Sequence, residues 1–335
     1  YKILNVRRMS VKKKLIILFC ILGIMAILTA CENKGEEKIT VVLDWTPNTN
    51  HTGLYVAEEK GYFKELGLNV EVVQPPEGGA ESLVASGKAQ FGIAFQDMIA
   101  PAFASDNPLP VTAVAALIQH NTSGIISLKG NGIETPKGMA NKIYATWDMP
   151  IEKAIIKSVV EADGGDYGSI RMVPSTVTDV VTALNTDMHA IWVYYAWDGI
   201  ATKVKGLETD FFAFKDINPV LDYYSPILIG NNEYIEKNKE KTEAFLKAIA
   251  KGYEYAIDNP EEAANILINA NPELDKELVQ ESQKWLADQY KAEVSQWGYI
   301  DQDRWDNFYS WLWEEGLIEK EIPSGFGFTN DYLPD

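Results

Sequence analysis

Between residues 40 and 115, short apolar runs alternate with longer stretches whose composition and apolar spacing suit helices. The β-rich runs are Thr40–Leu43, Asn69–Val73, Phe91–Ala94 and Val111–Ala115. The stretches between them, which favour helices, are Gly53–Glu65, Ala80–Ser86 and Asp97–Ser105. Strands that alternate with helices in this way are typical of βαβ units, so we expect an α/β fold built on a mostly parallel sheet.

The same alternation restarts after Gly130. The expected strands are Lys142–Thr146, Ile170–Val173 and Ala190–Val193, and the expected helices begin at Pro150 and at Thr178. Residues 82–94 and 181–193 also share one order of helix end, tight turn and buried strand. We therefore predict two lobes of similar plan, with lobe 1 at 39–128 and 222–335 and lobe 2 at 129–221.

The last third of the chain is predicted to be helical and to complete lobe 1. The expected helices are Glu233–Asp258, Pro260–Asn269, Asp275–Tyr290 and Asp303–Glu315. Apolar residues at helical spacing, such as Trp305, Phe308 and Leu312, indicate packing against a core. The chain is expected to cross between the lobes near Leu128–Gly130 and again near Pro219–Pro226. Such a pair of hinges places a ligand between the lobes.

The N-terminal segment has the pattern of a bacterial export signal. Lys12–Lys14 precede an apolar run, Leu15–Leu28, which is too short to span a membrane. The sequence Leu28-Thr29-Ala30-Cys31 resembles a lipobox, in which the cysteine is acylated and becomes the first mature residue. We predict a signal peptide with upstream residues at 1–30, lipidation of Cys31 and a tether at 31–38. The alternative is an ordinary signal peptide with an incidental cysteine.

Composition supports a globular, strongly acidic protein. The chain has 335 residues, 46% of them hydrophobic, and a formal charge of −18. Loss of residues 1–30 would remove six basic residues and no acidic one, so the charge would fall to −24. This charge disfavours nucleic acid as a partner. The two cysteines, Cys20 and Cys31, lie in or next to the signal, so we expect no disulfide and no metal-thiolate site.

One polar loop stands out at the end of the first predicted strand. Residues 44–53 read Asp-Trp-Thr-Pro-Asn-Thr-Asn-His-Thr-Gly and lead into a predicted helix. Ligands of open α/β sheets bind at the carboxyl ends of the strands. The candidate ligand-binding residues therefore follow strands in both lobes: Trp45, Asn48, His51, Gln96, Gln119, Trp147, Tyr194, Tyr195 and Asp198. The aromatic rings among them, together with Trp197, suit a flat heteroaromatic ligand.

The loop, continued by Gly61-Tyr62-Phe63-Lys64-Glu65-Leu66-Gly67-Leu68, resembles the substrate-binding proteins of ABC importers for thiamine pyrimidine precursors. It is also similar to the fungal thiamine-pyrimidine synthases. The resemblance implies a two-lobed periplasmic-binding-protein fold of type II with the ligand in the interlobe cleft. It implies an extracytoplasmic, lipid-anchored monomer that delivers N-formyl-4-amino-5-aminomethyl-2-methylpyrimidine to an ABC permease and its ATPase for salvage.

Two of the candidate residues have competing interpretations. Asp198 can accept from the exocyclic amine of an aminopyrimidine, or it can cap the following helix. The family more often has a glutamate at this position, so the aspartate leaves the ligand's identity open. His51 is either a ligand-contacting residue or a loop-packing residue. The three histidines lack metal-ligand spacing, and we expect no metal and no cofactor.

Two other functions remain open at this stage. Similar binding proteins take riboflavin or other flat heterocycles, and the additional rings of Trp147 and Trp197 could line a longer pocket. From a different class, the chain could be a pyrimidine synthase. The similar fungal enzymes use iron and a cysteine-rich motif, which this sequence lacks, and a secretion signal does not suit an enzyme with cytoplasmic cosubstrates. We therefore predict a binding protein and not an enzyme.

Overall fold

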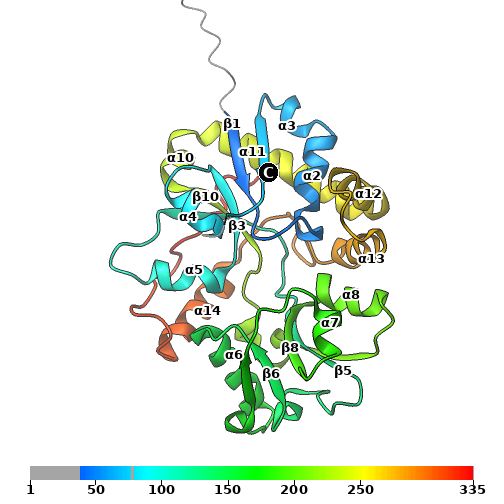
Figure 1. Cartoon of the computed structure of the whole chain (residues 1–335). Helices are drawn as coiled ribbons and strands as arrows, with labels where there is room; N and C mark the ends of the chain where they lie inside the picture. Colours follow the sequence, from blue (N-terminus) through cyan, green and yellow to red (C-terminus); the bar gives the residue numbers. More distant parts are fainter. Residues whose placement is uncertain (1–37, 77–78, 335) are drawn as a thin grey trace, which may run out of the picture. The chain divides into compact units, whose positions relative to one another are not determined.

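The computed structural model describes residues 38–76 and 79–334. The predicted signal peptide, Cys31 and most of the predicted tether lie outside these residues. The described residues form two five-stranded sheets, each with its own helices (Figure 1). Within the described residues, no helix is both long and apolar enough to cross a bilayer.

The sheet of lobe 1 has the strand order β2-β1-β3-β10-β4. Its strands are β1 (Lys38–Val42), β2 (Asn69–Val73), β3 (Phe91–Ala94), β4 (Val111–Ala116) and β10 (Ile227–Asn231). β1 pairs in parallel with β2 and β3, whereas β10 runs antiparallel to β3 and β4. β3 and β10 are buried along their whole length, as expected for central strands that are covered on both faces.

The sheet of lobe 2 repeats this plan with the order β7-β6-β8-β5-β9. Its strands are β5 (Ser123–Leu128), β6 (Ile143–Thr146), β7 (Arg171–Pro174), β8 (Ala190–Tyr194) and β9 (Thr209–Ala213). β6 pairs in parallel with β7 and β8, and β5 runs antiparallel to β8 and β9. Both sheets are therefore mixed. The prediction of a mostly parallel sheet is correct only for β2, β1 and β3 in the first sheet and for β7, β6 and β8 in the second.

β10 in the first sheet and β5 in the second sheet each follow directly after a crossing of the chain between the lobes. β5 belongs to the second sheet, so the first crossing lies at residues 117–122 and not near Leu128–Gly130. The predicted upper limit of lobe 1 at residue 128 is wrong for this reason. The return crossing lies between the end of β9 at Ala213 and the start of β10 at Ile227. The prediction that the last third of the chain is helical also missed β10.

The helices of lobe 1 are η1 (Thr49–His51), α2 (Thr52–Glu59), α3 (Tyr62–Glu65), α4 (Gly79–Ala85), α5 (Gln96–Phe103), α10 (Asn232–Lys237), α11 (Lys239–Asp258), α12 (Pro260–Ala270), α13 (Lys276–Ala287) and α14 (Gln302–Glu314). Figure 1 shows α11 and α12 beside α2. α11 and α2 pack closely because Gly53 and Gly252 meet: a Cβ on Gly252 would lie 2.0 Å from the carbonyl oxygen of Gly53. Trp305, Phe308 and Leu312 of α14 are buried in the core, as predicted.

The helices of lobe 2 are η2 (Pro136–Met139), α6 (Pro150–Ala162), η3 (Tyr167–Ser169), α7 (Val180–Leu184), η4 (Tyr195–Gly199), α8 (Ile200–Val204), α9 (Phe214–Ile217) and η5 (Pro219–Leu221). α6 begins at Pro150 because proline suits the first helical position, where its missing N–H is not needed. Its apolar face, with Ile155, Ile156 and Val159, is buried.

A charged network ties the two crossings together. His120 in the first crossing pairs through Nδ1 with Asp222 Oδ2 in the second at 2.6 Å, and through Nε2 with Glu293 Oε2 at 2.8 Å. The backbone N–H of Asn121 donates to Asp222 Oδ1 at 3.0 Å. Arg304 of α14 lies 3.4 Å from Glu293. The hydrogen bond to Asp222, and then that to Glu293, raise the pKa of His120 above its usual value.

This network predicts a pH-dependent contribution to stability. Because the pKa of His120 is raised in the folded state, its contribution is complete below about pH 6.5 and is lost as the pH rises through the folded-state pKa. We expect His120→Gln to lower the melting temperature by about 2 °C at pH 6 and by less at pH 9. Glu233→Gln, which removes an exposed ion pair with Lys237, serves as the control. A loss that is equal at both pH values would contradict the charged form of His120.

Candidate ligand site

Residues 44–51, called here the signature loop, connect β1 to α2 and carry three of the predicted ligand-binding residues. Asn48 is the N-cap of η1: its side-chain oxygen accepts from the backbone N–H of Asn50 at 2.9 Å, and its side-chain amide donates to the carbonyl of Thr46 at 3.1 Å. Asparagine is a preferred N-cap because its oxygen satisfies a free N–H of the first turn. The side chain of Asn48 is thus occupied within the loop.

His51 lies inside the signature loop and is completely buried. Its Nδ1 accepts from the backbone N–H of Asn48 at 3.2 Å, so the ring carries its proton at Nε2, which donates to Asp44 Oδ1 at 2.7 Å. Both ring nitrogens are therefore used within the loop. This geometry supports the loop-packing interpretation of His51 over direct ligand contact.

The rest of the signature loop is anchored by hydroxyl groups from α11, from α13 and from the segment that follows α13. Tyr253 of α11 donates to the carbonyl of Asn50, and Tyr290 donates to the carbonyl of Thr49, each at 2.6 Å. The hydroxyl of Thr49 lies 2.5 Å from that of Ser282 in α13. Ser282 in turn donates to the carbonyl of Ala196 in lobe 2. One chain of hydrogen bonds therefore links the signature loop to η4.

Two exposed tryptophans follow strands in opposite lobes. Trp45 follows β1 and is 55% exposed, and Trp147 follows β6 and is 42% exposed. The ring of Trp147 leans against Trp192, with a centroid distance of 5.5 Å. Exposed indole rings at strand ends can stack on a flat ligand. Within the described part of the chain, no ring contact joins Trp45 and Trp147 directly.

Tyr194 forms a stacked aromatic contact between the lobes. At the end of β8, it stacks on Phe95, which follows β3, with centroids 5.7 Å apart and planes inclined by 23°. Its hydroxyl accepts weakly from Ser225 at 3.5 Å. Burial raises the pKa of Tyr194, and the negative charges of Asp97, Asp44 and Asp198 raise it further. Carboxylates of both lobes therefore act on the hydroxyl of Tyr194 through their charge.

The other two aromatic residues of the Tyr-Tyr-Ala-Trp-Asp segment pack against lobe 1. Tyr195 contacts Trp285 of α13 at a centroid distance of 5.3 Å. Trp197 packs on a cluster of apolar side chains from α12 and α13, including Leu267 and Val279. These two rings hold η4 against lobe 1, so the prediction that Trp197 could line a longer pocket lacks support from this geometry.

The two predicted glutamines are buried and bonded to backbone groups. Gln96 donates to the carbonyl of Trp305 at 3.0 Å and accepts from the N–H of Tyr224 at 2.9 Å. Gln119 donates to the carbonyl of Tyr299 at 2.9 Å, while its Oε1 has no hydrogen-bond partner among the described residues. Gln96 therefore serves to connect β3, α14 and the return crossing, and only Gln119 keeps a free oxygen.

Asp198 lies in the π-helical turn η4, a rare conformation that is frequent at functional sites. Burial raises the pKa of its carboxyl group to about 6, and the charge of Asp179 contributes in the same direction. α8 begins after Gly199 and has no side-chain cap. Asp198 is therefore not the N-cap of α8, and a hydrogen bond from the backbone N–H of Tyr194, the N-cap residue of η4, lowers the pKa of the Asp198 carboxyl group.

Asp97 is a second carboxylate near the contact between Phe95 and Tyr194. It is not among the ligand-binding residues predicted from the sequence. It lies in the first turn of α5, two residues after Phe95. Its Oδ2 accepts from the hydroxyl of Tyr223 at 3.3 Å, and burial raises its pKa to about 6. The available signal was its position in Phe95-Gln96-Asp97, directly after a buried strand, in the same relation as the aromatic and acidic residues that follow β8.

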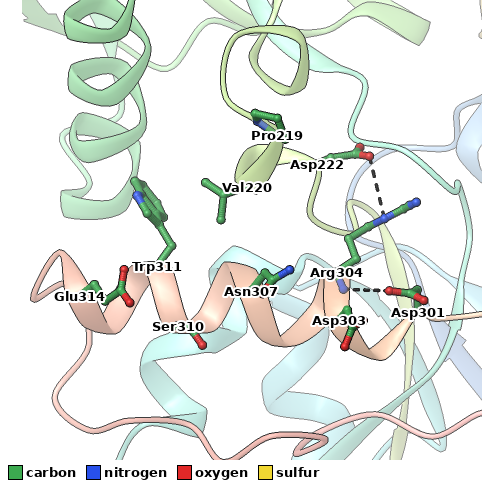
Figure 2. Close-up of a pocket in the computed structure, with 10 residues that line it drawn as sticks. All are labelled: Pro219, Val220, Asp222, Asp301, Asp303, Arg304, Asn307, Ser310, Trp311 and Glu314. Atoms are coloured by element: carbon green, nitrogen blue, oxygen red, sulfur yellow. Dashed lines mark hydrogen bonds and ion pairs between the residues drawn. The ribbon is translucent and has the colours of Figure 1, made fainter.

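A surface groove lies away from these residues. It measures about 540 Å³ and lies along α14 and the return crossing. Figure 2 shows its lining residues: Pro219, Val220, Asp222, Asp301, Asp303, Arg304, Asn307, Ser310, Trp311 and Glu314. None of the predicted ligand-binding residues lines this groove, and Arg304 and Asp222 are engaged in the network between the crossings. Over residues 38–76 and 79–334, no cluster of three or more His, Cys, Asp or Glu side chains could hold a metal ion.

Comparison with known proteins places the chain in a family. The family model described as NMT1/THI5 like matches residues 48–263. The chain belongs to the NMT1/THI5-like family. One relative, the formylaminopyrimidine-binding protein of Halalkalibacterium halodurans, is 30% identical over 308 residues, which cover 90% of this chain and 92% of the relative. The resemblance inferred from the signature loop is therefore confirmed.

Other members and solved structures extend the comparison. The 4-amino-5-hydroxymethyl-2-methylpyrimidine phosphate synthase THI13 of Saccharomyces cerevisiae is 26% identical over 330 residues, covering 89% of this chain and 88% of the enzyme. A ligand-binding component of an ABC-type import system from Staphylococcus aureus has the same fold, with a TM-score of 0.66, 13% identity and coverage of 88% of this chain and 96% of the other. The predicted two-lobed α/β periplasmic-binding-protein fold is confirmed, and this family includes binding proteins as well as enzymes.

The buried pair of His51 and Asp44 leads to a prediction about the signature loop. His51→Ala leaves the Asp44 carboxylate buried without its partner, so we expect a loss of about 3 kcal/mol in the free energy of unfolding. Urea denaturation measures this loss. His189→Ala is the control, because His189 accepts one backbone N–H and has no carboxylate partner among the described residues. Equal losses for the two variants would contradict the role of His51 in holding the loop.

Proposed function

We propose that this protein is the solute-binding component of an ABC importer and captures a thiamine pyrimidine precursor. The proposed ligand is N-formyl-4-amino-5-aminomethyl-2-methylpyrimidine. The observation that carries the proposal is 30% identity over 90% of the chain to a formylaminopyrimidine-binding protein. The partners would be a permease and a cytoplasmic ATPase, and the protein would act as a monomer without catalysing a reaction.

The arrangement of the strand-end residues supports a flat ligand between the lobes. The rings of Trp45 and Trp147 are exposed on opposite lobes, and Tyr194 lies at the contact between them. An aminopyrimidine offers flat faces to such rings and N–H donors to a carboxylate such as Asp198. Closure of the lobes would exclude water from the stacked ring and present one shape to the permease.

The acidic surroundings of Tyr194 favour a ligand without a phosphate group. Asp44, Asp97 and Asp198 all act on its hydroxyl. A phosphate would meet like charges in a poorly solvated position, which is unfavourable. The synthases of the family are named for a phosphorylated product. This difference supports binding and import of an uncharged or cationic pyrimidine over synthesis of its phosphate.

Ligand specificity can be tested with a thermal-shift panel of formylaminopyrimidine, hydroxymethylpyrimidine, thiamine, riboflavin and taurine. A ligand at a hundred times its dissociation constant stabilises the native state by about 2.7 kcal/mol, which corresponds to several degrees. We expect a shift with the pyrimidines alone. A shift with riboflavin alone would move the protein to flavin uptake, and a shift with taurine alone would refute a pyrimidine ligand.

Asp198→Asn tests the proposed contact to the amine of the ligand. Loss of a charged hydrogen bond should weaken binding by about tenfold to a hundredfold, measured by isothermal titration calorimetry. Asp179→Asn is the matched control, because Asp179 caps α7 through Thr182 and its carboxylate lies nearby. Equal affinity of Asp198→Asn and the wild type would remove Asp198 from the site.

The proposed location is the outer face of the cell membrane, with a lipid on Cys31. The support is the sequence Leu28-Thr29-Ala30-Cys31 after a basic and an apolar segment. We expect an inhibitor of lipoprotein signal peptidase, such as globomycin, to cause accumulation of a larger precursor on a denaturing gel. Cys31→Ser should have the same effect. An unchanged mature size in both experiments would contradict lipidation.

A further inference from the structure

We propose that Asp97 is a second ligand anchor, whose carboxylate accepts an N–H donor of the ligand from lobe 1 while Asp198 accepts another from lobe 2. This inference rests on the proposed function and adds a requirement for the ligand: it must carry two N–H donor groups. Asp97 lies in the first turn of α5, directly after the strand end that contacts Tyr194.

The first support is an unused hydrogen-bonding atom. Oδ1 of Asp97 exposes less than 1 Å² to solvent and has no hydrogen-bond partner among the described residues. Its other oxygen, Oδ2, accepts from Tyr223 at 3.3 Å, which is a long bond for a hydroxyl and a carboxylate. Most buried polar atoms in proteins are paired, so a buried carboxylate oxygen without a partner indicates a missing donor.

The second support is the absence of a compensating cation. Burial raises the pKa of Asp97, whereas hydrogen bonds from its own backbone N–H, from the Tyr223 hydroxyl and from the backbone N–H of Met98 lower it. No lysine or arginine is among these groups within the described part of the chain. The N–H groups at the start of α5 offset the charge only in part, since burial still raises the pKa. A ligand that brings an amine or a protonated ring nitrogen would supply the missing donor.

The third support is the position of Asp97 relative to the other lobe. Its negative charge raises the pKa values of Tyr194 in lobe 2 and of Tyr223 in the return crossing. Asp198 also acts on Tyr194. Phe95 stacks on Tyr194, and Asp97 and Asp198 lie two and four residues after these rings, so one carboxylate follows each of the strand ends that meet here. A ligand with two N–H donors would bind both carboxylates and so favour the closed arrangement of the lobes.

A role of Asp97 in packing and a role in ligand binding predict different effects of its replacement on stability. If Asp97 served mainly to stabilise the first turn of α5, its replacement by asparagine would lower the melting temperature of the ligand-free protein. Because folding instead raises the pKa of this carboxyl group, the charged form is disfavoured in the folded state at pH 7. We therefore expect ligand-free Asp97→Asn to melt at the wild-type temperature or above it.

The experiment measures both properties on the purified, processed protein at pH 7.5. Calorimetric titration with N-formyl-4-amino-5-aminomethyl-2-methylpyrimidine should give an affinity at least tenfold weaker for Asp97→Asn than for the wild type. Differential scanning calorimetry without ligand should show no loss of melting temperature. Asp216→Asn, at an exposed position in α9 of lobe 2, is the control and should change neither property.

The ligand requirement is tested with an analogue that lacks the 4-amino group. The wild type should bind it at least tenfold more weakly than the parent pyrimidine, and one of the variants Asp97→Asn and Asp198→Asn should show no further loss. Should Asp97→Asn not fold, Asp97→Ser removes the carboxylate and keeps a residue suited to a helix start.

The outcomes separate this inference from the proposed function. If the wild type binds none of the pyrimidines, the proposed function fails. If the wild type binds and Asp97→Asn binds equally well, the proposed function stands and the anchor at Asp97 is refuted. A weaker affinity together with a melting temperature lowered by several degrees would assign Asp97 to packing and also overturn the inference.

Discussion

The structure depends on an exchange of strands between the two lobes. β5 reaches the second sheet directly from lobe 1, and β10 reaches the first sheet directly from lobe 2. Each strand lies between two others and hydrogen-bonds to both, so neither sheet is complete without a segment that has just crossed. The ends of β3 and β8 meet where Phe95 stacks on Tyr194.

This exchange also explains which part of the fold the sequence could predict. The βα units were located within one or two residues, because their apolar runs are flanked by amphipathic helices that set the period. β5, β9 and β10 were missed, since a short apolar run such as Ile227–Asn231 has no periodicity that separates it from the start of a helix. The error in the first crossing follows, because the sheet that a strand joins is decided by partners distant in sequence.

For the candidate site, too, the structure supports some of the residues predicted from the sequence and not others. Residue type and position after a strand indicated Trp45, Trp147 and Asp198, which the structure leaves exposed or with a raised pKa. The same reasoning selected His51 and Gln96, whose polar atoms are already bonded to other groups of the protein. A sequence shows that a side chain can form hydrogen bonds but not whether the protein itself already supplies the partner. That distinction decides whether a polar residue at a strand end is available to a ligand.

Asp97 and Asp198, the two carboxylates with raised pKa values, lower the stability of the ligand-free protein in a way that favours ligand binding. Asp97 and Asp198 each have a pKa of about 6 in the folded state, above the ordinary value near 4. Between about pH 4 and pH 6 the folded protein holds more protons than the unfolded chain, so these groups lower stability as the pH rises. At neutral pH both are charged and the cost is complete. A ligand that donates N–H groups to them lowers this cost, and the free energy regained appears as affinity for that ligand.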